Sequence, residues 1–185
     1  MLLKAVVILM KRVLFVLAII GLISCNRDSP ELSPEGIYPP SIEPPFIEYV
    51  ARFLEEAEKR GLNGNDEMVE AIQSLTIAFD ANLDFYCGWA DWSEDSDQVI
   101  ISIGIQPRCW SESSDTDKEI LIFHELGYGL LQRFHLDERL PNGDFKSLMH
   151  AGNQFGLYQE QDVKRSYYLD ELFDPDTSIP EWAKD

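Results

Sequence analysis

Apolar residues recur every three to four positions along residues 46–57, and Gly61 follows shortly afterwards. Side chains with this spacing share one face of an α-helix, and a glycine is a common stop signal. The pattern therefore predicts an amphipathic helix of about four turns. We expect its aromatic side chains, Phe46 and Phe53, to lie in the hydrophobic core.

Three stretches alternate apolar with other residues, which is the period of a β-strand. They cover residues 75–79, 85–89 and 99–105, and an acidic segment, 91–97, separates the last two. This segment lacks the glycine and the distal glutamate of a calcium-binding loop, so we expect a solvated loop. The alternation predicts a small sheet that precedes the helices of the second half of the chain.

Helix signals dominate the second half of the chain. Thr116 and Glu119 fit a capping box, which predicts a helix that begins at Thr116 and carries the apolar residues of 120–131. A polar stretch follows, and a last helix is predicted over 159–172, before Pro175. A sheet followed by helices is typical of the α+β class.

The beginning of the chain has the order of an export signal. Lys11 and Arg12 precede a short apolar run, 13–23, which is too short to span a membrane and is typical of a secretory signal peptide. Leu-Ile-Ser then leads to Cys25, an order typical of the bacterial lipobox, in which the cysteine is lipidated and becomes the first mature residue. The alternative is an ordinary membrane anchor with an incidental cysteine. Met10 fits a natural start better than the initial methionine.

Residues 26–45 are rich in proline, serine and glutamate and can bury little apolar surface. We interpret them as a tether. The sequence thus predicts a signal peptide (1–24), a lipidated Cys25 with its tether (25–45) and one folded domain (46–185). We expect the protein in the bacterial cell envelope, anchored by lipid to the outer membrane or to the periplasmic face of a membrane. The sequence does not indicate an oligomeric state.

The composition argues against one class of function. The 185 residues contain 33 Asp and Glu against 15 Lys and Arg, a balance that argues against nucleic-acid binding. Cys87 and Cys109 remain once Cys25 is lipidated. In an exported protein we expect them to form one disulfide, and two free buried thiols are the alternative.

The candidate chemistry lies in residues 123–135, which read Phe-His-Glu-Leu-Gly-Tyr-Gly-Leu-Leu-Gln-Arg-Phe-His. His124 and Glu125 begin the pattern H-E-x-x-H, in which two histidines one helical turn apart bind zinc and the glutamate acts as general base. Tyr128 stands where the second histidine belongs. A His-Glu pair alone is weak evidence, because such pairs are common on helix surfaces.

The order of the motifs adds to this evidence. A sheet, a His-Glu helix, a later histidine, a Ser-Leu-Met segment and a C-terminal helix together resemble the metzincin clan of zinc endopeptidases. More narrowly, the chain resembles bacterial lipoproteins assigned as zinc metallopeptidases, which carry His-Glu-Leu-Gly-His, Arg-x-His, Ser-Ile-Met and Leu-Asp-Glu-Leu-Phe. The matching residues here are 124–127, 133–135, 147–149 and 167–173.

The resemblance implies a small zincin-like domain with a mixed sheet, an active-site helix, a Met-turn and a C-terminal helix. It implies that zinc-activated water hydrolyses a peptide or protein substrate. His124 would be the first zinc ligand, Glu125 the general base and His135 the third ligand, with Met149 packed beneath the metal. His135 lies one residue further from His124 than in the usual metzincin motif.

Three interpretations of Tyr128 are open: it binds the metal as a phenolate, it fills the site and abolishes binding, or it is a tolerated substitution. We favour lost or weakened zinc binding, because catalytic zinc sites usually use three ligands from His, Glu, Asp or Cys. The remaining histidine, His150, is expected at the surface. The competing function is a non-catalytic lipoprotein whose cleft binds peptides or a protein partner.

Overall fold

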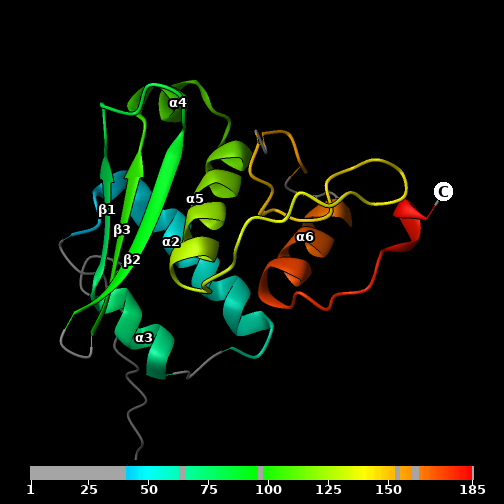
Figure 1. The fold of residues 1–185 in the computed structure, drawn as a ribbon, viewed down its shortest axis with the longest axis horizontal. Coiled ribbons are helices and arrows are strands. Elements are labelled where there is room, and N and C mark those ends of the chain that lie inside the picture. Colours follow the sequence, from blue (N-terminus) through cyan, green and yellow to red (C-terminus); the bar gives the residue numbers. More distant parts are fainter. Residues whose placement is uncertain (1–40, 63–65, 96–97, 153–154, 160–162, 185) are drawn as a thin grey trace, which may run out of the picture. The chain divides into compact units, whose positions relative to one another are not determined.

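The computed structural model describes residues 41–62, 66–95, 98–152, 155–159 and 163–184 (Figure 1). All of them belong to the second of two compact units, Ile37–Asp185. The predicted signal peptide, Cys25 and most of the tether lie outside the described residues. None of the helices in the described ranges is both long enough and apolar enough to cross a membrane.

The sheet has three strands in the order β1-β3-β2. The central strand β3 (Gln98–Ile105) runs parallel to β1 (Leu75–Phe79) and antiparallel to β2 (Gly88–Asp95), so the sheet is mixed. Every second residue of β3, namely Ile101, Ile103 and Ile105, is buried. This alternation is the one that the sequence predicts for both β1 and β3, and the structure confirms these two strands.

The prediction for β2 is wrong at both ends. The strand begins only at Gly88, and Phe85 and Tyr86 lie exposed in the preceding loop. It then continues through the acidic segment to Asp95, where a solvated loop was expected. Main-chain pairing of Asp91 with Ser102 and of Asp95 with Gln98 holds this half of the hairpin, and an edge strand tolerates charged side chains.

In the part of the chain that the structure describes, five helices and one 3-10 turn accompany the sheet. Helix α5 (Asp115–Gly129) lies between the sheet and α6 (Val163–Phe173), and it contacts β2, β3 and α2 (Pro44–Lys59) (Figure 1). The shorter α3 (Asp66–Gln73), α4 (Pro107–Glu112) and η2 (Glu181–Ala183) were not predicted. The described chain is therefore of the mixed α+β class.

Helix α2 begins two residues before the predicted start. Pro44 and Pro45 form its first turn, where the missing amide hydrogen of proline costs nothing. The expected boundary between tether and domain, at residue 45, thus falls inside a helix. The chain is already ordered just before α2, because Ile42 pairs with Ile77 of β1 and the Ser41 hydroxyl donates to the Leu75 carbonyl at 2.7 Å.

Two later helices also begin at residues other than those predicted. Ser114, not Thr116, is the N-cap of α5: its side-chain oxygen accepts from the Asp117 amide at 3.1 Å. Ser114 has the extended backbone of a cap, and Thr116 lies inside the first turn. Helix α6 begins at Val163 rather than at Gln159, and it ends at Phe173 as the Asp-Pro sequence predicts.

Aromatic side chains join the layers of the core. Phe53 of α2 packs edge-on against Phe123 of α5, with ring centroids 5.3 Å apart, and lies 5.0 Å from Phe173 of α6. Phe46 makes a similar contact with Trp110 at 4.9 Å. The helical stripe predicted for α2 therefore faces the core and holds α5 against it, which positions the motif of α5 at the edge of the sheet.

Candidate functional site

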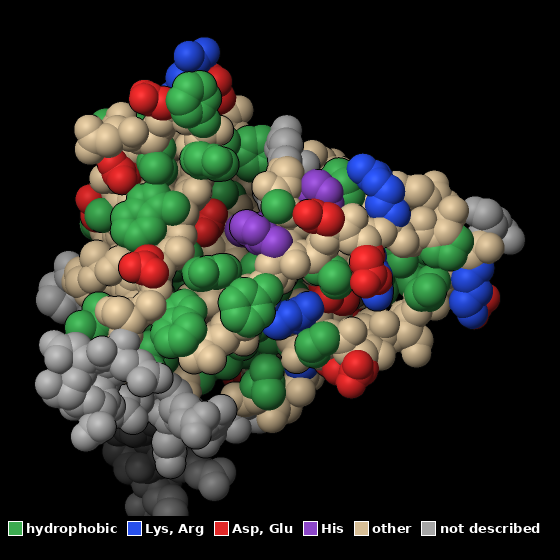
Figure 2. All heavy atoms as spheres, viewed as in Figure 1, with side chains coloured by type: hydrophobic (Ala, Val, Ile, Leu, Met, Phe, Trp, Pro, Cys, Tyr) green, Lys and Arg blue, Asp and Glu red, His purple; other side chains and the backbone are tan. Residues whose placement is uncertain are grey.

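A cavity of about 710 Å³ lies between the start of β2 and α5. This volume is in the range of small-molecule and peptide side-chain pockets. Figure 2 shows histidine side chains and a neighbouring acidic side chain set among hydrophobic ones on this face. The described lining residues come from 85–90, from α5, from His135 beyond that helix, and from Ala151, Gly152 and Phe155. From α5 they are Leu121, His124, Glu125 and Tyr128.

His124 is held in one orientation and one tautomer. Only 7% of its surface is exposed, and its Nδ1–H donates to the Leu148 carbonyl at 2.9 Å. Since a carbonyl can only accept, Nε2 keeps the lone pair. Burial lowers the pKa of His124 to about 4, against a smaller opposing effect of the Leu148 bond. The ring is therefore neutral near pH 7, in the form that metals bind.

His135 lies beyond the helix, yet it returns to the same cavity. The ring centroids of His124 and His135 are 5.4 Å apart, with their planes 27° from parallel. Two imidazoles on one tetrahedral zinc, with Zn–N distances of about 2.0–2.1 Å, would have centroids about 5 Å apart. The separation of the two rings therefore fits a shared metal ion.

Tyr128 faces this pair of histidines. Its ring is half-buried, lines the cavity and lies 6.3 Å from the ring of His135. Within the described ranges, no group of three or more His, Cys, Asp or Glu side chains could hold a metal ion. The two histidines alone would leave a zinc ion short of the usual three protein donors, and the phenol oxygen of Tyr128 is the candidate for the third.

Glu125 is buried at the wall of the cavity. Its side chain is 6% exposed, and burial raises its pKa to about 8. Gly88, the first residue of β2, covers the carboxylate so closely that a Cβ there would lie 2.5 Å from Glu125 Oε1. A glycine at the start of a strand permits such close approach. Sequence reasoning missed Gly88, although a glycine in a strand pattern was a visible signal.

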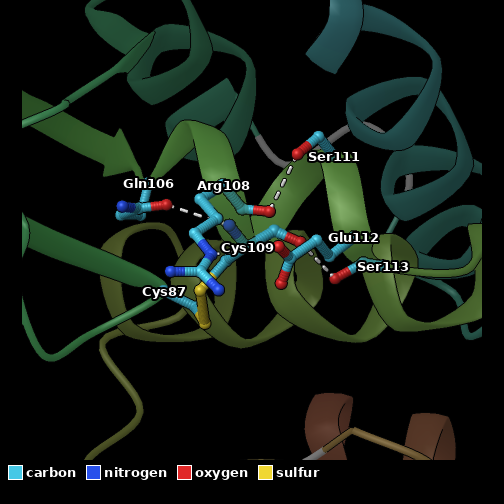
Figure 3. Close-up of a disulfide and its surroundings, with 7 residues drawn as sticks. All are labelled: Cys87, Gln106, Arg108, Cys109, Ser111, Glu112 and Ser113. Atoms are coloured by element: carbon cyan, nitrogen blue, oxygen red, sulfur yellow. Dashed lines mark hydrogen bonds and ion pairs between the residues drawn. A yellow bond between two sulfur atoms is a disulfide. The ribbon is translucent and has the colours of Figure 1, made fainter.

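A disulfide joins the residue before Gly88, Cys87, to Cys109 (Figure 3). Cys87, which lines the cavity, is bonded to Cys109 of α4 with an S–S distance of 2.08 Å and a Cα–Cα distance of 5.4 Å. The Cys87 carbonyl also accepts from the Gln106 amide at 2.9 Å. The pairing expected from the sequence is thus present, and it joins the start of β2 to α4 directly before Gly88.

The Ser-Leu-Met segment forms a buried turn below α5. Met149 is fully buried, and a Cβ at Gly127 of α5 would lie 2.7 Å from its sulfur. The turn contacts both histidine segments: Leu148 accepts from His124, and the Met149 carbonyl accepts from the Leu136 amide at 2.9 Å. Met149 is therefore a packing residue beneath the motif helix.

The exit from α5 uses an uncommon backbone conformation. Gln132 has φ +52°, in the left-handed region, and the next amide, of Arg133, donates back to the Gly127 carbonyl at 3.0 Å. A non-glycine residue in this region costs about 1–2 kcal/mol. The turn brings His135 back toward His124, so the longer spacing between the two histidines does not separate them.

His150 does not line the cavity. Its ring packs on Phe145, with centroids 3.7 Å apart, and its Nδ1 accepts from the Gly152 amide at 2.8 Å. His150 was expected at the surface, but its side chain is partly buried, with 16% of its surface exposed.

Comparison with protein-family models, curated proteins and solved structures gave no match to this chain. The chemistry of the site must therefore be argued from its own residues. It combines a neutral imidazole held by a backbone carbonyl, a second imidazole at metal-sharing distance, a phenol, and a buried carboxylate. Such a set can bind a divalent cation and move a proton next to it.

Proposed function

We propose that this protein is a lipid-anchored, zinc-dependent metallopeptidase of the bacterial cell envelope, built on a small zincin-like domain. The observation that carries the proposal is the meeting of His124, His135 and Glu125 at one cavity. His135 reaches it only through the turn after α5, so the sequence motif alone does not require this meeting.

The residues have distinct roles in the proposed reaction. His124 and His135, with Tyr128 as the third donor, would hold the zinc ion. Zinc, when bound, polarises the peptide carbonyl and lowers the pKa of a bound water. The charge of a bound metal ion would favour the ionised form of Glu125, so that its carboxylate could accept a proton from the water and return it to the departing amine. Gly88 and the buried wall keep bulk water from its carboxylate.

The cavity also suits an extended peptide. Among the described residues no other strand pairs with the outer edge of β2, and Gly88, Trp89 and Ala90 of that strand line the cavity. A free strand edge can bind a peptide main chain as an added strand. Exposed aromatic rings, including Phe85 and Tyr86, border it, and no Lys or Arg occurs among the described lining residues. These features favour peptides with bulky apolar or cationic side chains.

A second function is favoured by Tyr128. Because a phenol replaces the expected imidazole, the site offers only two donors of the usual kind. The alternative is a non-catalytic protein of the same fold that binds a peptide or a protein partner in the cavity without cleaving it.

The two functions differ in zinc content and turnover. We would purify the full-length protein in detergent, measure its zinc by mass spectrometry, and test cleavage of a mixed peptide library with and without a chelator. The proposed enzyme loses cleavage with the chelator and regains it with zinc. Glu125→Gln should abolish cleavage with zinc retained, whereas the exposed control Glu112→Gln should not. Peptide binding without zinc or cleavage would instead support the alternative.

A further inference from the structure

A buried carboxylate lies below the candidate site on α6. Glu171 is fully buried, and both of its oxygens are used. Oε1 accepts from Arg133 Nη2 at 2.6 Å, and Oε2 accepts from the Ser147 hydroxyl at 2.6 Å. A buried charge of this kind is retained only when it is paired and hydrogen-bonded. Glu171 does not line the cavity, and it has no direct role in the proposed reaction.

One branch of this cluster leads to His124. The Ser147 oxygen that donates to Glu171 also accepts from the Met149 amide at 2.9 Å, which closes a tight turn. Leu148 is the middle residue of that turn, and its carbonyl accepts from His124 Nδ1. The direction of the Leu148 carbonyl, and with it the orientation of the His124 ring, therefore depends on the turn that Ser147 closes.

The other branch leads to His135. Arg133 Nη1 donates to the carbonyls of Glu171 and Leu172 at 2.6 and 2.7 Å, which anchors this residue on the last turn of α6. Arg133 lies two residues before His135. On the other side of His135, Leu136 donates its amide to the Met149 carbonyl of the same turn. Both flanks of His135 are thus held by groups that depend on Glu171.

We propose that Glu171, with Arg133 and Ser147, is a positioning cluster. It fixes the distance between the rings of His124 and His135 and their relative orientation. The inference rests on the proposed function only in taking the paired histidines to be metal ligands. The cluster acts through other residues and does not contact a substrate. A single carboxylate orients two ligands that come from different segments of the chain.

A second buried cluster provides a matched control. Glu119 of α5 is 4% exposed and accepts from Arg165 at 2.8 Å and from the Tyr158 hydroxyl at 3.0 Å. Glu119, Arg165 and Tyr158 do not line the cavity. This second cluster has the same chemistry as the positioning cluster, namely a carboxylate, a guanidinium and a hydroxyl. Among the described side chains, no hydrogen bond links it to either histidine.

The test compares Ser147→Ala and Glu171→Gln with Tyr158→Phe and Glu119→Gln in the full-length protein. Histidine side-chain signals are recorded by ¹⁵N NMR at one fixed pH without metal, and zinc affinity is then measured by titration with zinc alone. In Ser147→Ala and Glu171→Gln, we expect the Nδ1–H signal of His124 to shift or broaden and zinc affinity to fall about 10- to 100-fold, the usual effect of losing an outer partner. The two control variants should keep both properties even where their melting temperature falls.

Unchanged histidine signals in a folded Ser147→Ala protein would overturn the proposal. Ser147→Ala removes one oxygen atom and leaves the pairing of Glu171 with Arg133, so it tests the idea even if Glu171→Gln fails to fold. If the wild type binds no zinc but the histidine signals still shift, the positioning role stands and the zinc-dependent function fails. If zinc binds equally well in all variants with unchanged signals, the positioning role fails alone.

Discussion

Two buried carboxylates on α5 lie less than two turns apart and differ in almost every contact. Glu119 accepts from Arg165 and Tyr158, and it lies 3.6 Å from Arg52. Glu125 is buried to a similar degree, but no ion pair or hydrogen bond to it is found among the described residues. One helix therefore carries one fully paired carboxylate and one that is desolvated beside a cavity.

The contrast separates a structural from a chemical use of burial. Around Glu119 the charges are balanced and tie α2, α5 and α6 together. Around Glu125, burial raises the pKa to about 8, because no described partner offsets the free-energy cost of burying the charged carboxylate. Perturbed groups at the wall of a cavity are candidates for catalysis, whereas paired groups between helices are candidates for stability. The predictions below test this division.

The largest expected effect is on catalysis. Glu125→Gln should reduce peptide cleavage about 10²- to 10⁴-fold, since it removes the one carboxylate among the described residues that line the cavity. Glu119→Gln should leave the rate per folded molecule unchanged. Cleavage kinetics with matched zinc content measure both. Comparable losses in the two variants would remove the distinction between the carboxylates.

The second effect is on stability, and here the substitution of Glu119 should have a larger effect than that of Glu125. Breaking a buried ion pair by removing one charge costs about 3–5 kcal/mol, so Glu119→Gln should lower the free energy of unfolding by about this amount. Glu125→Gln should not lower it, because Glu125 has no partner to lose. Urea denaturation at pH 7 followed by circular dichroism compares the two. A larger loss in Glu125→Gln would contradict the comparison.

The third effect is on zinc affinity. Tyr128→His would complete a three-histidine donor set on one face of α5 and the following turn. We expect zinc affinity to rise about 100-fold, which corresponds to about one ligand's share of a zinc site. Calorimetric titration measures this change, and Glu125→Gln in the Tyr128→His background should keep the zinc without cleavage. A folded Tyr128→His protein with no gain in affinity would mean that the inferred metal geometry is wrong.

The fourth effect is on the pH dependence of stability without metal. The pKa of Glu125 is raised from 4.5 to about 8, so the folded state holds a proton that the unfolded state releases. Its stabilising contribution is full below pH 4.5 and is lost as the pH rises through 8, about 3 kcal/mol of it by pH 7. Glu125→Gln should abolish this decrease. Because His124 is common to both proteins, its own titration between pH 6.5 and 4 cancels in the difference.

Glu56, in the paired region, should show the reverse dependence. Burial alone would raise its pKa, but hydrogen bonds from Arg60 and Lys59 and the charge of Arg165 outweigh burial and lower the pKa to about 2. Its contribution is present above pH 4.5 and is lost as the pH falls through 2. Glu56→Gln should therefore flatten the acid side of the stability curve only. An equal change above pH 6 would contradict the assignment.

The smallest effect concerns Gly88, which lies against the Glu125 carboxylate. Gly88→Ala would place a methyl group 2.5 Å from Glu125 Oε1, so the carboxylate or the start of β2 must move. Overpacking of this kind typically costs about 1–3 kcal/mol. Thermal unfolding measures the cost, and an unchanged melting temperature would contradict the close approach of Gly88 to Glu125. We expect cleavage by the Gly88 variant to fall by less than in Glu125→Gln.

The sequence by itself determined the features that depend on neighbouring residues. The helical stripe of α2, the alternation in β1 and β3, and the Asp-Pro end of α6 are local patterns, and the structure follows them. The acidic half of β2 is different, because its side chains favour a loop and only pairing with β3 makes it a strand. The cap of α5 is Ser114 rather than Thr116, because Ser114 has the extended backbone of a cap and its side-chain oxygen accepts from the Asp117 amide.

At the candidate site, the motif pointed to His124 and Glu125 because both lie within one helical turn. The resemblance added His135 and Met149, but tertiary structure alone decided how the residues of the site meet. His135 reaches the cavity through the left-handed turn at Gln132, and Gly88 covers Glu125 from a strand far away in the sequence. Glu171 connects both histidines through contacts 24 and 38 positions along the chain. No local pattern reports such contacts, because they arise only when separate elements pack together and a buried charge must find its partners.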